Sequence, residues 1–83
     1  MKNNYMEKIF YTPGDIVTVK QDIPNKPEMI VLKKETYLVK GVQGDSEDVL
    51  KGMRCRWFTK NQEIQEAIFS TKDLVLITKA TNN

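Results

Sequence analysis

The chain has 83 residues, which is enough for one small domain but leaves little room for a deep pocket. Hydrophobic residues make up 40% of it and charged residues 29%, the proportions of a globular protein rather than a disordered one. The net charge of +2 permits a polyanionic partner without favouring one, since nucleic-acid-binding proteins usually carry a larger and more clustered positive excess.

The residue types that the sequence lacks exclude several classes of enzyme. There is no histidine, which excludes Ser-His-Asp and Cys-His catalysis. Cys55 is the only cysteine, so one chain cannot assemble a structural zinc site or an iron–sulfur site. No glycine-rich phosphate-binding motif occurs. We therefore expect a protein that is not an enzyme and that uses no cofactor, no metal and no small-molecule substrate.

The single cysteine and the hydropathy pattern also bear on the compartment. Cys55 cannot form an intramolecular disulfide, and a small domain without disulfides is typical of a reducing compartment. No apolar run has the length of a signal peptide, or the roughly 20 residues of a membrane helix. The expected location is the cytoplasm, with no membrane partner.

The first predicted strand follows a polar N-terminal arm, residues 1–12. Pro13 and Gly14 indicate a turn after the arm, because proline presets φ and glycine accepts a positive φ. Residues 15–20 alternate in polarity and are rich in β-branched side chains, which predicts a strand. Residues 21–27 contain two prolines and predict a loop.

The next stretch of strand-like sequence permits two arrangements. Residues 28–33 and residues 36–42 both have the composition of strands. They form either one long bent strand over 28–42 or two strands that meet at a tight turn near Lys34. We favour the second arrangement.

Residues 43–52 are ambiguous. Gly44 indicates a break, after which Asp45 or Ser46 would cap a short helical turn. A solvated loop fits the same residues equally well, and both interpretations stay open.

Residues 53–69 give the clearest hairpin signal, two alternating stretches joined by a turn over 59–62. If Met53, Cys55 and Trp57 face the core, the loop must have an odd length and centre on Asn61. An even length would place Glu66 in the core opposite Cys55, which is costly without a partner. Cys55 then acts as a small buried hydrophobe. The expected pairs are Met53 with Phe69, Cys55 with Ala67, Trp57 with Gln65, Arg56 with Glu66, Phe58 with Ile64 and Thr59 with Glu63.

The chain ends with a turn over 70–73, a strand over 74–77 and a polar tail over 79–83. No long stretch has the helical period of 3.6 residues. Five to six short antiparallel strands with Pro and Gly turns predict a mostly β protein, a small barrel that forms a single domain over 13–78.

Four segments, taken in order, carry a family resemblance. They are PGDIVTVK at 13–20, KPEMIV at 26–31, GMRCRWF at 52–58 and EIQEAIFSTKDLVLI at 63–77. The sequence resembles the YodC-like family of small uncharacterised bacterial proteins. This resemblance implies an SH3-like barrel, and it implies no agreed activity, cofactor or catalytic residue. Residues 33–50 depart from the family pattern and look like an insertion, as does the N-terminal arm.

Aromatic and aliphatic side chains of the hairpin are the first candidates for a binding surface. Trp57 and Phe58 are adjacent and point to opposite faces of their strand, and Trp57 is expected in the barrel wall unless it anchors a partner. Phe58 shares the outer face with two isoleucines, an apolar patch that the N-terminal arm or a second copy of the chain should cover. The candidate partner-binding residues are Phe58, Ile64, Ile68 and Trp57.

Basic residues near the same hairpin are the second candidates. A stripe of them would contact phosphates, although Arg56 facing Glu66 also fits a solvated face. The candidate phosphate contacts are Arg54, Arg56, Lys60, Lys33 and Lys34. We expect a binding or accessory module that acts through its sheet surface on a protein partner or on a second copy of itself. The alternative is a nucleic-acid-binding small barrel that uses the basic stripe.

Overall fold

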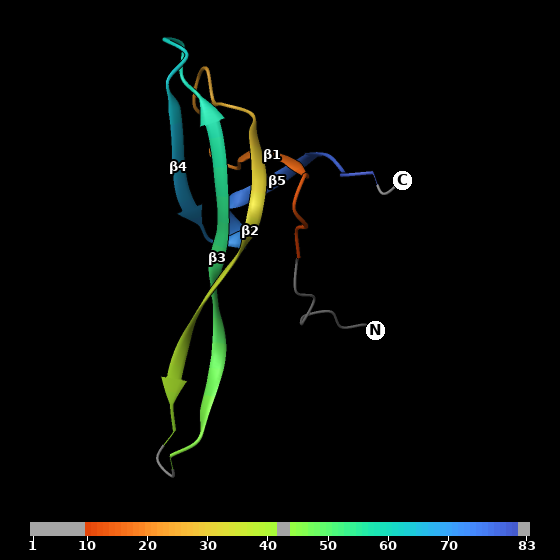
Figure 1. Cartoon of the computed structure of the whole chain (residues 1–83). Helices are drawn as coiled ribbons and strands as arrows, with labels where there is room; N and C mark the ends of the chain where they lie inside the picture. Colours follow the sequence, from red (N-terminus) through yellow and green to blue (C-terminus); the bar gives the residue numbers. More distant parts are fainter. Residues whose placement is uncertain (1–9, 42–43, 82–83) are drawn as a thin grey trace.

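The computed structural model describes residues 10–41 and 44–81 of the chain. Five strands form one antiparallel sheet in the order β4-β3-β2-β1-β5 (Figure 1). The elements are β1 (Ile16–Val19), β2 (Met29–Lys40), β3 (Ser46–Phe58), β4 (Ile64–Phe69), η1 (Thr71–Asp73) and β5 (Leu74–Thr78). The 3₁₀ turn η1 joins the two edge strands. The predicted mostly β class is confirmed, with five strands, and the arrangement is consistent with a small barrel-like fold.

The structure corrects the prediction for residues 28–52. The two strands favoured for 28–42 are one long strand, β2, so the preferred turn near Lys34 is wrong. The β2–β3 ladder has two irregularities, between Val31 and Lys33 and between Glu35 and Thr36. Such irregularities bend a strand without ending it, so β2 continues through the charged residues 33–35. The helical turn and the solvated loop considered for residues 43–52 are both wrong over residues 46–52, because β3 begins at Ser46.

The β3–β4 hairpin has the predicted register. Met53 pairs with Phe69, Cys55 with Ala67, and Phe58 with Ile64. Thr59 N donates to Glu63 O at 2.9 Å, which leaves a loop of three residues centred on Asn61.

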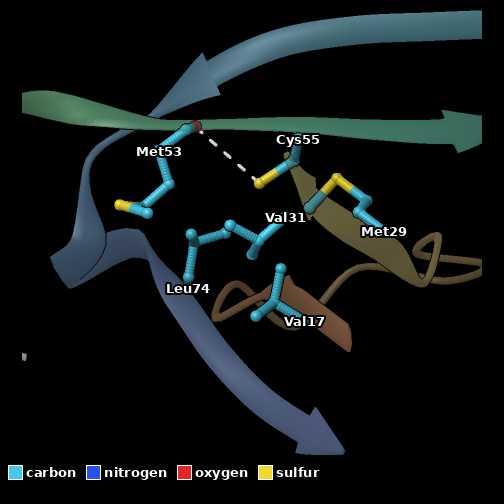
Figure 2. Close-up of a cluster of buried hydrophobic side chains, with 6 residues drawn as sticks. All are labelled: Val17, Met29, Val31, Met53, Cys55 and Leu74. Atoms are coloured by element: carbon cyan, nitrogen blue, oxygen red, sulfur yellow. Dashed lines mark hydrogen bonds between the residues drawn. The ribbon is translucent and has the colours of Figure 1, made fainter. Parts of the chain in front are cut away.

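The core lies between the inward sides of the strands. Six apolar side chains are almost fully buried there (Figure 2), namely Val17, Met29, Val31, Met53, Cys55 and Leu74. Around them pack four partly buried apolar residues, Tyr11, Val19, Trp57 and Phe69. Five of these six residues lie at alternating positions of β1, β2 and β3, and Leu74 lies in β5. Each strand therefore contributes only the side chains of its inward side to the core.

A buried carboxylate, Asp15, holds the two ends of the described chain together. One carboxylate oxygen accepts from the Ala80 backbone N–H at 2.7 Å and the other from the Thr12 N–H at 2.9 Å. The Thr12 hydroxyl and the Lys79 ammonium donate at 3.1 Å and 3.4 Å. Burial acts to raise the pKa of Asp15, but these hydrogen bonds outweigh it and lower the pKa to about 2.

The β2–β3 hairpin extends well beyond the body of the sheet (Figure 1). β1 pairs with β2 only at Met29 and Ile30, and β4 pairs with β3 only as far as Met53. Residues 36–40 and 46–50 therefore have ladder partners only in each other, within the described part of the chain. We call them the distal hairpin. They lie within the segment predicted as an insertion. Residues 1–9 of the predicted N-terminal arm lie outside the described residues.

Gly52 marks the point where the distal hairpin leaves the body. It pairs with Glu35, next to an irregularity in the ladder. A Cβ atom at this position would collide with the backbone carbonyl of Phe69. Only glycine lets β3 approach the end of β4 this closely.

Asp15→Asn is expected to lower the free energy of unfolding at pH 7 by about 1.5–3 kcal/mol, the size of hydrogen bonds to a charged group. The folded pKa of about 2 lies below the ordinary 3.8, so this stabilisation is complete above about pH 4. It is lost as the pH falls toward 2. Denaturant titrations at several pH values measure it.

The control for Asp15→Asn is Asp22→Asn, which removes a charge from an exposed loop without removing these hydrogen bonds. Equal acid sensitivity of the wild type and Asp15→Asn between pH 4 and pH 2 would contradict the role given to this carboxylate.

Gly52→Ala is expected to lower the free energy of unfolding by about 1–3 kcal/mol, as overpacking of a tight contact does. Gly41→Ala is the matched control, since its Cβ would meet Asp45 at an ordinary 3.5 Å, and it should stay within about 0.5 kcal/mol. Chemical denaturation of both variants checks this, and equal stability of the two would refute the close-approach argument.

Candidate functional site

The outer side of the sheet carries an apolar surface around Phe58. Phe58 is 64% exposed and its cross-strand neighbour Ile64 is 57% exposed. On the same side Ile30 pairs with Arg56, and Ile16 pairs with Ile30. Alternation thus places these side chains opposite the core. We call Phe58, Ile64, Ile30 and Ile16 the Phe58 patch.

The Phe58 patch borders a shallow depression of about 340 Å³. It spans β5, β1, β2 and β3, because residues from all four strands line it. The lining residues are Ile16, Glu28, Met29, Ile30, Arg56, Trp57, Phe58 and Thr78. An apolar depression with one arginine and one glutamate at its margin suits an apolar side chain flanked by polar groups.

The structure places the four predicted partner-binding residues in two different settings. Phe58 and Ile64 lie together, and Ile68 lies further along β4, half-buried opposite Arg54. Trp57 faces the core side, where its ring packs on Phe69 with centroids 5.9 Å apart and planes tilted by 57°. The outer surface therefore depends on Phe58 and Ile64 more than on Trp57.

Sequence reasoning did not find Ile16 and Ile30, which extend the patch across two further strands. Each lies beside a buried residue in its own strand, so alternation indicates its outward position. Their adjacency to Phe58, however, follows from the registers of β1 on β2 and of β2 on β3. The register of β2 on β3 cannot be predicted from the sequence, because it shifts at the irregularity after Val31.

Next to the patch lies a group of paired charges, which we call the ionic belt. It consists of Lys33, Glu35, Arg54, Arg56 and Glu66. Arg54 Nε lies 2.6 Å from Glu35 Oε2, and Arg56 Nη2 lies 2.6 Å from Glu66 Oε2. The hydrogen bond from Arg54 lowers the pKa of Glu35, and the one from Arg56 lowers the pKa of Glu66.

Secondary contacts connect the ionic belt into one network. Arg54 Nη1 also reaches Glu66 Oε1 at 3.4 Å, and Lys33 Nζ lies 3.7 Å from Glu35 Oε2. Glu66 was expected as the partner of Arg56 and occupies that position. Glu35 was not foreseen, since a contact between residues 19 positions apart depends on the β2–β3 register.

The ionic belt weakens the prediction that a basic stripe contacts phosphates. Of its five predicted members, Arg54, Arg56 and Lys33 are paired with carboxylates. Lys34 pairs with Met53 in the ladder, which places it on the other side of β2 from Arg54. Lys60 lies in the β3–β4 turn, beyond Phe58. These five residues do not form a continuous row of free cations for phosphates.

Residues 10–41 and 44–81 contain no group of three or more acidic, cysteine or histidine side chains placed to hold a metal ion. No helix in the same residues has the length and hydropathy needed to span a bilayer. Cys55 is buried, and its Sγ donates to the Met53 carbonyl at 3.7 Å. Burial raises the pKa of its thiol to about 11.

Comparison with known proteins identified no relative of this chain. No protein-family model, curated protein or solved structure matches the chain. The resemblance to the YodC-like family stays a prediction.

Cys55 is expected to resist thiol reagents in the folded protein. A pKa of about 11 instead of the ordinary 9.0 makes the thiolate about 100-fold scarcer at neutral pH, and burial slows access further. Reaction with a chromogenic disulfide at pH 7, in buffer and in denaturant, measures the difference. An added Gln21→Cys in the exposed loop after β1 is the control, and equal rates at the two cysteines would show that Cys55 is accessible.

Proposed function

We propose that this protein is a binding module without catalytic activity, and that it binds a protein through the Phe58 patch. The observation that carries the proposal is the exposure of Phe58 and Ile64 beside the apolar depression that Ile16 and Ile30 line. An antiparallel sheet that faces water normally presents polar side chains on that side. Contiguous exposed apolar surface rimmed by polar residues is typical of protein–protein interaction sites.

The ionic belt supports a protein partner over a polyanion. Its carboxylates lie within 2.6 Å of the arginines, so much of the positive charge beside the patch is neutralised. Phosphate binding would require those pairs to open. A protein surface can instead meet a rim of satisfied charges, which adds specificity without leaving unpaired groups.

The alternative, a nucleic-acid-binding barrel, is less well supported for the same reason. It predicts retarded migration of RNA or DNA at low salt, with affinity that falls by orders of magnitude as salt rises. We place the protein in the cytoplasm, where a lone buried cysteine such as Cys55 persists as a thiol.

Phe58→Glu is expected to abolish capture of the protein partner, because a charge in the centre of an apolar interface typically costs more than about 2 kcal/mol. The measurement is affinity capture from the native host with the immobilised chain, together with the solution mass of the free chain. Ile64→Glu should behave like Phe58→Glu. Gln21→Glu, with the same charge change in an exposed loop, should behave like the wild type.

The proposal is wrong if Phe58→Glu retains every partner and the mass of the wild type. It is also wrong if the wild type captures no protein and is a monomer. Salt-sensitive binding of nucleic acid that Phe58→Glu leaves intact would favour the alternative.

A further inference from the structure

The distal hairpin exposes more apolar surface than two paired strands can cover. Tyr37 is 51% exposed and Leu38 is 62% exposed, and Val39 and Leu50 are also exposed. Tyr37 and Leu38 are adjacent in a strand, so they point to opposite sides of the hairpin. A two-stranded hairpin is at best marginally stable alone in water, so this one needs a further surface to pack on.

The body of the same chain does not provide that surface. The distal hairpin points away from β1, β4 and β5 (Figure 1). The pairing of β2 with β1 ends at Ile30, and that of β3 with β4 ends at Met53. Within residues 10–41 and 44–81 the hairpin thus has no such surface, and we look for it on another molecule.

Charge identifies the kind of molecule. The distal hairpin together with its turn, residues 36–50, contains one lysine, Lys40, and three acidic residues, Asp45, Glu47 and Asp48, a net charge of −2. Since the whole chain carries +2, the rest of it carries +4. The hairpin is apolar and acidic. The body presents the apolar Phe58 patch, where Arg56 is paired with Glu66 and Glu28 also lines the depression, and its net charge has the opposite sign. Both surfaces are therefore apolar, and they belong to parts of the chain with opposite net charge.

We propose that two copies of this chain form a twofold dimer in which the distal hairpin of each copy lies on the Phe58 patch of the other. This inference rests on the proposed function, because the patch is the same and the partner is now a second copy. One twofold axis generates both contacts, so the assembly closes at two copies. Each contact covers two apolar surfaces that the described residues of one chain leave exposed.

Contacts between like surfaces fit less well. Two distal hairpins packed together would bring −2 against −2 and leave both Phe58 patches exposed. Two bodies packed through their patches would bring +4 against +4 and leave both hairpins without a neighbour. Only the exchange of hairpin for patch brings parts of opposite net charge together and covers both surfaces.

Two variants and their mixture distinguish these arrangements. Phe58→Glu damages the patch and keeps the hairpin, whereas Y37S/L38S removes apolar side chains from the hairpin and keeps the patch. Serine is chosen because it adds no charge that could attract Glu at position 58. Each variant alone should dimerise at least about 30-fold more weakly than the wild type, the effect of losing an interface hot spot.

The mixture is the decisive measurement. An intact hairpin from Phe58→Glu meets an intact patch from Y37S/L38S, so the mixed dimer regains one of its two contacts. Sedimentation of labelled Phe58→Glu should therefore show a heterodimer when Y37S/L38S is added and no dimer without it. Far-ultraviolet circular dichroism and thermal unfolding check that both variants fold, and Gln21→Glu serves as the charge control.

Each contrary result excludes the proposal in a specific way. A monomeric wild type at concentrations up to about 1 mM excludes the dimer, since contacts of this kind are far stronger than that limit. A normal dimer of Y37S/L38S indicates packing of patch on patch, and a normal dimer of Phe58→Glu indicates packing of hairpin on hairpin. A folded mixture that stays monomeric also excludes the exchange. If the wild type is monomeric but Phe58→Glu loses a captured protein, the proposed function stands and only the dimer falls.

Discussion

The small size of the core is the constraint on which the rest of this structure depends. Six apolar side chains are almost fully buried, whereas twelve large apolar side chains of the described residues remain exposed. A chain of this length buries only about 60–65% of the surface that it exposes when unfolded. One layer of inward-facing residues from β1, β2, β3 and β5 fills the available interior, and within the described residues no second layer lies above the outward-facing side chains.

A core this small needs help from polar and backbone contacts. The Asp15 carboxylate accepts hydrogen bonds from the backbone of Thr12 and of Ala80, which follows β5. It therefore links segments that lie 65 positions apart, from Asp15 to Ala80. Tyr11 adds a hydrogen bond from its hydroxyl to the Leu74 carbonyl at 3.1 Å. Gly52 lets β3 pass close to the end of β4. These contacts hold the strands of the body around the core. They do not involve the outer side of the sheet or the distal hairpin.

The parts of the fold that depend on local pattern could be predicted from the sequence. In the β3–β4 hairpin, alternation and the cost of burying Glu66 determine the register, and a three-residue loop follows from them. Phe58 and Ile64 were found as surface residues by the same reasoning. The mostly β class follows from strand length, turn residues and the lack of helical periodicity.

The parts that depend on contacts between distant segments could not be predicted. Lys33 and Glu35 look like the charged centre of a turn in the sequence. In the structure Lys33 lies opposite Arg54 in the β2–β3 ladder, and Glu35 forms ion pairs with both Arg54 and Lys33. The sequence between Gly44 and Gly52 has no strong strand pattern of its own. It becomes a strand because β2 offers Tyr37 and Leu38 as cross-strand neighbours, which is tertiary context overriding local preference.

Among the described residues, the strands enclose one small core, and the distal hairpin and the Phe58 patch remain exposed, as the proposed dimer requires. Hydrogen exchange at two protein concentrations tests this account most directly, since a hairpin of two strands is weakly protected unless it is covered. We predict that protection of the amides of residues 36–40 rises with protein concentration, while that of Val17 and Thr18 in β1 stays constant. Protection of the distal hairpin that is independent of concentration would contradict it.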